Sequence, residues 1–317
     1  MALAYDAPRS GSDRARAGMY ESHYVKAADP DGGRAVWLRH TVLSRPDGGG
    51  QRTTVWLTVF DRTAGTVVEQ RRVTDEAGYV APATGWSQAA QGTLGPTGAD
   101  GAMEDATWTL RWDPVDAESV PYLPKRWLYD RAIPRSNGVA LLPFARMAGT
   151  VAIGEHRIEL DGWPGMIGHN WGSDHALHWV WMHAAGIGPA GAAWFDGALA
   201  RVPTVAGRVS PWLGAGAVML DGARRRVAMR GAALTVSPGV GGDAVHVQAR
   251  VDGGRLDVHA TLPADETVAW DYAAPHDDGR RVRNCSIAEG RVVLTTPTAT
   301  TEIPLDGVLA LELGEPA

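Results

Sequence analysis

The chain has 317 residues, of which 44% are hydrophobic and 21% charged, so we expect a globular protein with a sizeable core rather than a disordered one. Its formal net charge of −6 leaves no basic excess for a phosphate backbone, so no nucleic-acid partner is expected. One cysteine, Cys285, excludes an internal disulfide, and no apolar run is typical of a secretory signal or a membrane helix. We therefore predict a cytoplasmic protein without an integral membrane segment.

Alternating apolar and polar residues predict β-strands along most of the chain. In TTVWLTVF, residues 53–60, the apolar side chains of Val55, Leu57 and Val59 share one face. The stretch TWTLRW, residues 107–112, alternates in the same way. Turn sequences rich in Asp and Gly, such as RPDGGG and VDGG, separate the predicted strands. Many short strands with few helical candidates predict an all-β protein built of antiparallel barrels or sandwiches.

Two loop-like stretches divide the predicted strands. Five prolines between Asp113 and Phe144 predict a long irregular connection, with at most a short strand near RWLYD. A second loop is expected at 201–216, and a series of short strands follows it to the C-terminus. Together with a length typical of about two domains, this pattern predicts an N-terminal domain at 1–185 and a C-terminal domain at 186–317.

The stretch GHNWGSDHALHWVWMHA, residues 168–184, has the highest density of candidate functional residues, with four of the ten histidines and three of the 13 tryptophans. A zinc site is one interpretation, because imidazole and carboxylate groups are good zinc ligands. On a β-strand, alternation places His178 and His183 on opposite faces, so the two cannot bind one ion. The helical His-x-x-x-His signature is also absent, and we expect no metal.

Proton transfer is the second interpretation of this stretch. The ordinary pKa of a histidine lies near neutrality, which makes His169 a candidate for proton transfer. Asp174 would become an acid if it were buried among tryptophan rings, because desolvation raises the pKa of a carboxyl group. These two residues are the candidate catalytic pair. The alternatives stay open: His169 as a hydrogen-bonded core residue, and Asp174 as the cap of the NWGSD turn.

Aromatic residues of the same region predict a ligand wall. Trp179 and Trp181 share one face of the predicted strand and would be neighbours in any barrel interior, although they could equally fill the core between two β layers. Glu21, in YESHY, shares a strand face with His23, and a surface strand is the alternative there. The candidate substrate-binding residues are Glu21, Asn170, Trp171, His175, Trp179, Trp181, His183 and Trp194.

Three segments of the chain carry a family resemblance. YESHYVKAADPDGGRAVWLRHTV, the central stretch and RNCSIAEGRV resemble the AttH-like/hydroxyneurosporene synthase group of two-domain, lipocalin-like β-barrel proteins. That group is similar to carotenoid 1,2-hydratases, tocopherol cyclases and lipocalin-like Diels–Alderases. The resemblance covers residues 19–310, and its most specific parts are His169–Gly172 and Tyr20–Glu21. Gly168 stands where carotenoid hydratases have an Asp before the motif histidine.

The resemblance implies two packed calycin-like antiparallel barrels with an apolar cavity in or between them, acting on polyenes, prenylated phenols or polyketide-derived chains without metal or nucleotide. The sequence also lacks a phosphate loop, a G-x-G-x-x-G helix start and a G-x-S-x-G elbow, so no cofactor is expected.

Our first hypothesis for the function is acid-assisted hydration, cyclisation or isomerisation of a hydrophobic small molecule such as a terpenoid. The alternatives are a noncatalytic carrier of a lipid or pigment and an interaction protein in which the central motif locks the two barrels together. The oligomeric state is left open.

Overall fold

The computed structural model describes residues 9, 17–46, 50–65, 67–75, 85–131, 134–204, 207–276 and 278–317. Over this part of the chain the protein is all-β, with two antiparallel sheets and no α-helix, so the predicted fold class is confirmed. No helix in the described ranges is long and apolar enough to cross a membrane. The cytoplasmic location stays a prediction.

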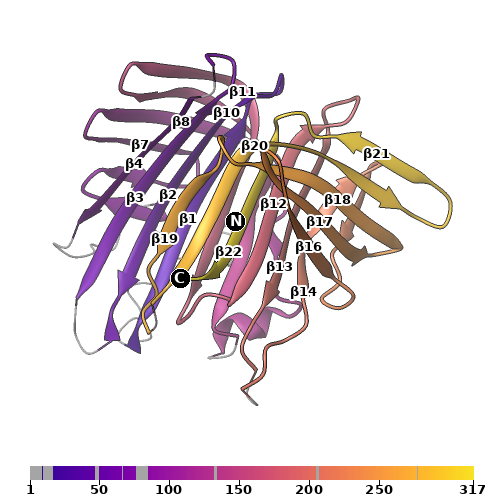
Figure 1. The fold of residues 1–317 in the computed structure, drawn as a ribbon. Helices are drawn as coiled ribbons and strands as arrows, with labels where there is room; N and C mark the ends of the chain where they lie inside the picture. The colour runs from indigo at the N-terminus through magenta and orange to yellow at the C-terminus, as the bar shows by residue number, and fades with distance from the viewer. Residues whose placement is uncertain are drawn as a thin grey trace.

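The first sheet contains the strands from Met19 to Gly172 (Figure 1). Its strand order is β4-β3-β2-β1-β11-β10-β8-β7-β6-β5, and β9 pairs with β10 beside this path. The strands are β1 (Met19–Ala28), β2 (Arg34–Ser44), β3 (Gln51–Asp61), β4 (Val67–Asp75), β5 (Ser87–Ala89), β6 (Gly92–Leu94), β7 (Gly98–Met103), β8 (Ala106–Asp116), β9 (Val120–Pro121), β10 (Ser136–Ile153) and β11 (His156–Gly172).

The second sheet contains the strands from His178 to Pro316, in the order β15-β14-β13-β12-β22-β20-β18-β17-β16, with β19 and β21 paired to β20. A bridge between Val227 and Val251 brings the β15 end of this sheet back toward β17. The strands are β12 (His178–Ile187), β13 (Ala193–Arg201), β14 (Leu213–Leu220), β15 (Ala223–Arg226), β16 (Ala233–Gly239), β17 (Gly242–Val251), β18 (Gly254–Pro263), β19 (Val268–Tyr272), β20 (Arg280–Thr295), β21 (Thr300–Pro304) and β22 (Leu309–Pro316).

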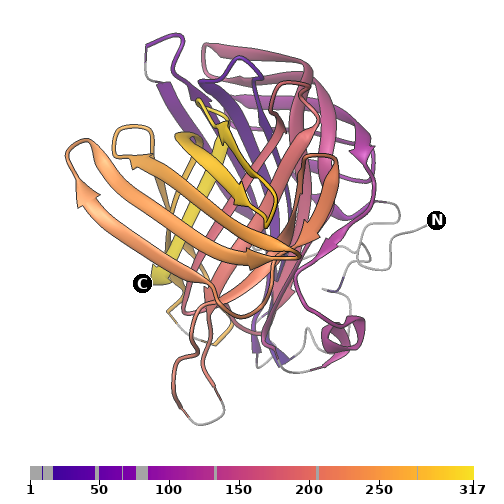
Figure 2. The same ribbon diagram turned by 90° about the vertical axis from the view of Figure 1, so that its right-hand side faces the viewer.

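The chain passes from the first sheet to the second between Gly172 and His178, because β12 pairs with β13 and β22 and not with β11. The domain boundary near residue 185 stays a prediction. The two sheets pack against each other where β10 and β11 meet β12, where β10 meets β13, and where β1, β2 and β3 meet β20. These contacts run through the middle of the molecule (Figures 1 and 2). This packing buries both faces of the central strands, so every residue of β1 is buried.

The proline-rich segment is more regular than the sequence predicted. Strand β8 continues through Pro114 to Asp116, and β10 contains Pro143. The pairing of β10 with β8 and β11 shifts register near Phe144. A proline has no N–H for a ladder hydrogen bond, and a strand tolerates it at such an irregularity. RWLYD forms a 3-10 helix at Arg126–Asp130 instead of a strand.

Buried apolar residues form three groups. One fills the first sheet and includes Leu38, Leu57 and Leu110. A second fills the concave side of the second sheet and its contact with β2 and β3. The third lies between the sheets and includes Phe144 and Trp194. The first sheet curves round so that β3 contacts β5, and we call it the first barrel. Strand β1 divides the first group from the third, because its odd-numbered side chains enter the first barrel and its even-numbered side chains face the second sheet.

Candidate functional site

A cavity of about 220 Å³ lies between the two sheets. Its walls are mostly aromatic and aliphatic, and strands of both sheets supply them. Even-numbered residues of β1, among them Tyr24, form one side, and Trp179 and Trp181 of β12 form the other. Ala198 and Ala200 of β13 continue the second wall, because they share a strand face with the residues opposite them on β12. Apolar walls with a few polar groups are typical of a small-molecule site.

Asp196 lies on the same face of β13, one step beyond the alanines that line the cavity. Its side chain has no solvent exposure. Burial raises the pKa of the Asp196 carboxyl from 3.8 to about 7, and hydrogen bonds from Tyr122 and Trp181 oppose part of this rise. The Tyr122 hydroxyl and the Trp181 indole N–H both donate to Oδ1, at 3.1 and 3.0 Å. Since Tyr122 and Trp181 line the cavity, Asp196 lies directly behind its wall.

Tyrosine hydroxyls connect this carboxyl to the cavity. The hydroxyl of Tyr24 lies beside that of Tyr122, and both side chains line the cavity. Desolvation raises the pKa of each phenol far above 10, so both stay neutral at physiological pH. A neutral hydroxyl donates and accepts hydrogen bonds at once, so Tyr122 can pass a proton from Asp196 to a bound molecule.

A second carboxylate, Glu312 of β22, lines another part of the cavity. Its Oε1 accepts a 2.9 Å hydrogen bond from the Trp179 indole N–H, and its Oε2 accepts one of 3.0 Å from the Tyr272 hydroxyl. Arg39 completes this side: its guanidinium carbon is 3.9 Å from the centroid of the Tyr272 ring, and its Nε donates to Ser22 Oγ at 2.6 Å. The cavity therefore contains one carboxylate in its wall and one carboxyl group of raised pKa directly behind it.

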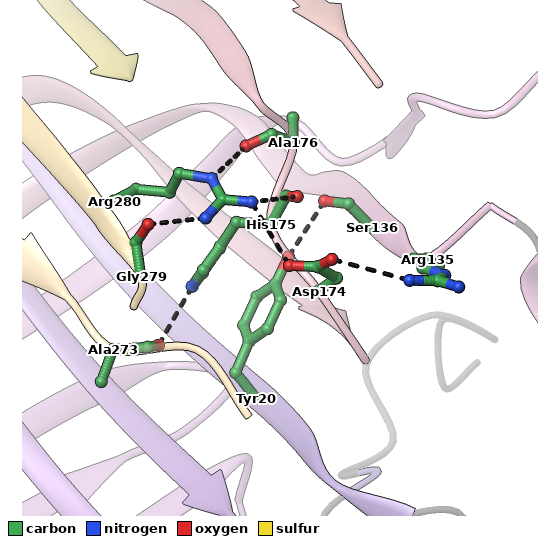
Figure 3. Close-up of polar contacts among 9 residues, drawn as sticks. All are labelled: Tyr20, Arg135, Ser136, Asp174, His175, Ala176, Ala273, Gly279 and Arg280. Atoms are coloured by element: carbon green, nitrogen blue, oxygen red, sulfur yellow. Dashed lines mark hydrogen bonds and ion pairs between the residues drawn. The ribbon is translucent and has the colours of Figure 1, made fainter. Parts of the chain in front are cut away.

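His175 lines the cavity, and Asp174 precedes it in the link between the two sheets; Figure 3 shows the polar contacts of both residues. The Asp174 carboxylate forms ion pairs with Arg280 at 3.4 Å and with Arg135 at 3.8 Å. The His175 ring stacks on Tyr20 at 3.9 Å between centroids, and its Nε2 is 3.2 Å from the backbone oxygen of Ala273. These contacts tie the link to the first sheet through Tyr20 and Arg135 and to the second sheet through Arg280.

His169 and Trp171 lie in the first barrel and do not line the cavity. The His169 Nε2 atom is 2.9 Å from Glu21 Oε1, and both side chains are buried. Asn170, between them in sequence, points the other way and lines the cavity. Gly168 also faces this side, and a Cβ there would lie 2.2 Å from the Tyr24 ring. The Tyr24 ring therefore explains why a glycine stands before the motif histidine.

The structure thus brings together only part of the site predicted from sequence. Asn170, His175, Trp179 and Trp181 line the cavity. Glu21, His169 and Trp171 form a separate group inside the first barrel. His183 is buried with its Nε2 3.0 Å from the backbone oxygen of Pro143, and Trp194 is buried between the sheets.

Sequence reasoning missed Asp196, Tyr122 and Glu312. A signal for Asp196 existed, since it is the only acidic residue of the apolar strand AWFDGALAR and shares a face with Trp194, two residues earlier. Tyr122 lies in the proline-rich segment that was expected to be irregular. No local pattern connected these residues, because they come from three distant parts of the chain.

Two groups of side chains in the described ranges have metal-ligand chemistry. Glu21, His23 and His169 form one, inside the first barrel, and His246, Asp257 and His259 form the other, on the second sheet. In each group the possible ligand atoms lie within 4.8 Å of one another. The first group includes His169 of the stretch for which the sequence analysis considered zinc, but neither group includes His175, His178 or His183.

Comparison with known proteins gives relatives in sequence and in structure. No family model matches the chain. Two uncharacterized proteins, from Mycobacterium tuberculosis strains CDC 1551/Oshkosh and H37Rv, are each 28% identical over 171 residues, which is 54% of this chain. The alignment spans about half the length (50%) of these curated relatives.

Two solved structures match nearly the whole chain. A proposed AttH from Nitrosomonas europaea has a TM-score of 0.54 and 13% identity, with 98% of both chains covered. Kievitone hydratase from Nectria haematococca has a TM-score of 0.54 and 9% identity, with 99% of this chain and 92% of that chain covered. The resemblance inferred from the sequence motifs is therefore confirmed at the level of the fold: the chain shares the two-sheet β-barrel architecture of AttH-like proteins and kievitone hydratase.

Proposed function

We propose that the chain is a cofactor-independent enzyme that adds water to a carbon–carbon double bond of a hydrophobic small molecule held between the two sheets. One observation carries this proposal. Asp196 is a fully buried carboxyl group whose pKa burial raises to about 7, and it is hydrogen bonded to two residues that line the cavity. An acid with a pKa near the operating pH is suited to general acid catalysis.

The geometry supports a proton relay through Tyr122. In its acid form, Asp196 donates from Oδ1 to the Tyr122 hydroxyl oxygen, and Tyr122 passes its own proton to one carbon of the double bond. The other carbon becomes cationic, and the faces of Trp179 and Trp181 stabilise it through their quadrupoles. Water then bonds to that carbon and loses a proton to Glu312. The net reaction converts an alkene and water into an alcohol, and the two carboxyl groups exchange one proton with solvent to reset.

The cavity also indicates what the substrate carries. Its aromatic walls favour a flat, apolar molecule. The side-chain amides of Asn137 and Asn170 line the cavity, and the Oδ1 atom of each is buried without a hydrogen-bond partner in the described residues. Two such acceptors would bind hydroxyl groups of the substrate. A phenol or alcohol on an unsaturated apolar skeleton fits these features, and the fold shared with kievitone hydratase adds support.

The same observations favour Asp196 over the pair predicted from sequence. The Asp174 carboxylate pairs with the buried Arg280 and is not among the residues that line the cavity. His169 lies on the opposite side of β11 from the cavity. Cyclisation or isomerisation would use the same acid with an internal nucleophile or base in place of water, so the class of product distinguishes these reactions.

Isotope labelling tests the proposal. The purified protein is incubated in H₂¹⁸O with a panel of prenylated phenols, including kievitone, and of polyenes, and the products are analysed by mass spectrometry. We expect one substrate to gain water with the label, and turnover to fall at least about 100-fold in Asp196→Asn and in Tyr122→Phe. Activity should also fall as the pH rises through about 7, because Asp196 then loses its proton.

Asp105→Asn is the matched control, since this carboxylate is exposed and pairs with Arg71 away from the cavity. Unchanged turnover in folded Asp196→Asn would refute the assignment, and loss of turnover in His169→Ala alone would favour the original pair. A carrier needs no acid. Binding of panel compounds, detected by tryptophan quenching, without conversion of any of them would favour that alternative.

A further inference from the structure

Three histidines lie side by side inside the first barrel. In the register of the sheet, His23 of β1 is directly opposite His40 of β2 on one side and His169 of β11 on the other. Directly paired residues point to the same face, so the three imidazoles form a row across three strands. Glu21, two residues before His23, lies on the same face and contacts His169. This group is on the opposite side of β1 from the interdomain cavity.

The spacing of these side chains suits a single ion. The possible ligand atoms of Glu21, His23 and His169 all lie within 4.8 Å of one another. Three atoms at such separations lie within about 2.8 Å of a common point (4.8 Å divided by √3), against 2.0–2.2 Å for zinc bonds to nitrogen and oxygen. The rings of His23 and His169 are nearly parallel, with centroids 3.9 Å apart, so each must rotate to direct its nitrogen at that point. The site therefore closes around an ion only when both rings turn.

Two of the histidines have buried nitrogens without a hydrogen-bond partner in the described residues, namely Nε2 of His23 and Nε2 of His40. Both side chains are at least nine-tenths buried. Such atoms are costly in an apolar interior unless something binds them. The Ser87 hydroxyl lies 3.3 Å from His40 Nδ1, and this contact orients the ring while Nε2 has no partner in the described residues.

We propose that Glu21, His23 and His169 bind one divalent transition-metal ion of the zinc type inside the first barrel, with His40 as the fourth ligand. The ligands come from three adjacent strands, so the ion would cross-link β2, β1 and β11 and stabilise the barrel. Its place behind the cavity wall gives it a structural role, independent of the proposed hydration chemistry. The sequence expectation of no metal rested on His178 and His183, whereas this group joins residues far apart in the chain.

The second candidate group provides the internal control. Asp257 accepts hydrogen bonds from Arg255 at both of its oxygens, at 2.7 Å each, and from Gln248 and His246. Its lone pairs are therefore already used, and His246 and His259 are only partly buried. We expect this group to contribute no tight site.

Cobalt and zinc titrations test the proposal. The chain is stripped with a chelator, its fold is checked by circular dichroism, and Co²⁺ is added while the visible d–d absorption is recorded. Zn²⁺ affinity and stoichiometry come from calorimetry. We expect one tight ion per chain, a rise in the melting temperature on binding, and an affinity at least about 100-fold weaker in His23→Ala. His246→Ala should bind like the wild type.

Because truncation could unfold the barrel, His23→Gln provides a second variant of similar size. Retention of wild-type affinity in either folded His23 variant would overturn the proposal. So would the absence of a cobalt spectrum in the wild type, or loss of the tight site in His246→Ala.

Discussion

Replacing Asp196 with asparagine should abolish the proposed activity and at the same time stabilise the protein above pH 7. The two side chains have nearly the same shape, and an amide keeps an oxygen that accepts from Tyr122 and Trp181. The difference between them is the charge, which the wild-type residue must carry in a fully buried position once it ionises.

The pKa of Asp196 gives the expected magnitude. Folding raises this pKa from 3.8 to about 7. Between these two values the folded chain holds a proton that the unfolded chain has released, so the free energy of unfolding falls as the pH rises. A rise of about three pKa units corresponds to about 4 kcal/mol, lost between pH 4 and pH 7. The asparagine variant has no such loss, so its advantage over the wild type should grow by about 2–3 kcal/mol from pH 5 to pH 8.

Urea unfolding of both proteins at several pH values, followed by circular dichroism, measures this difference. Other buried groups titrate in both proteins, so their effects cancel in the comparison. Tyr122→Phe serves as a companion variant: it removes a hydrogen bond that lowers the pKa of Asp196, so the loss of stability should extend to higher pH. A stability difference between wild type and Asp196→Asn that does not change between pH 5 and pH 8 would show that the carboxyl has an ordinary pKa.

Three further predictions concern positions around the cavity and between the sheets. Gly314→Ala would place a Cβ 2.3 Å from the Trp179 ring, so we expect the indole to shift and the affinity for a hydrophobic fluorescent probe to fall several-fold. Lys26→Met should raise the free energy of unfolding by about 3–5 kcal/mol at pH 6 and by less at pH 10. Burial lowers the lysine pKa from 10.5 to about 7, so the folded chain carries a buried charge only below about pH 7. Equal gains at both pH values would contradict this prediction. Arg62→Ala should lower the free energy of unfolding by about 2 kcal/mol, since it leaves the carboxylate of Glu266 buried without its two hydrogen bonds from the guanidinium, and an unchanged urea midpoint would argue against it.

Local patterns in the sequence were sufficient for the fold class. Alternation in stretches such as 53–60 is a property of neighbouring residues, and the structure places Val55, Leu57 and Val59 together in the first barrel. The same rule correctly paired Trp179 with Trp181 on one face, which lines the cavity. The motif around His169 was also sufficient to indicate the two-barrel architecture that the solved structures share.

The composition of the site depended on tertiary structure. Alternation shows which residues share a face, but β1 and the second half of β11, from Trp163, are buried on both sides, and only the packing of the second sheet decides which side borders the cavity. That packing turned Asn170 toward the cavity and His169 away from it. It also buried Asp196 against Tyr122, from a part of the chain 74 residues away. A raised pKa arises from such long-range burial. The sequence by itself therefore determined the strands and, through the family resemblance, the barrels, whereas only the assembled sheets determined which carboxyl group has the raised pKa.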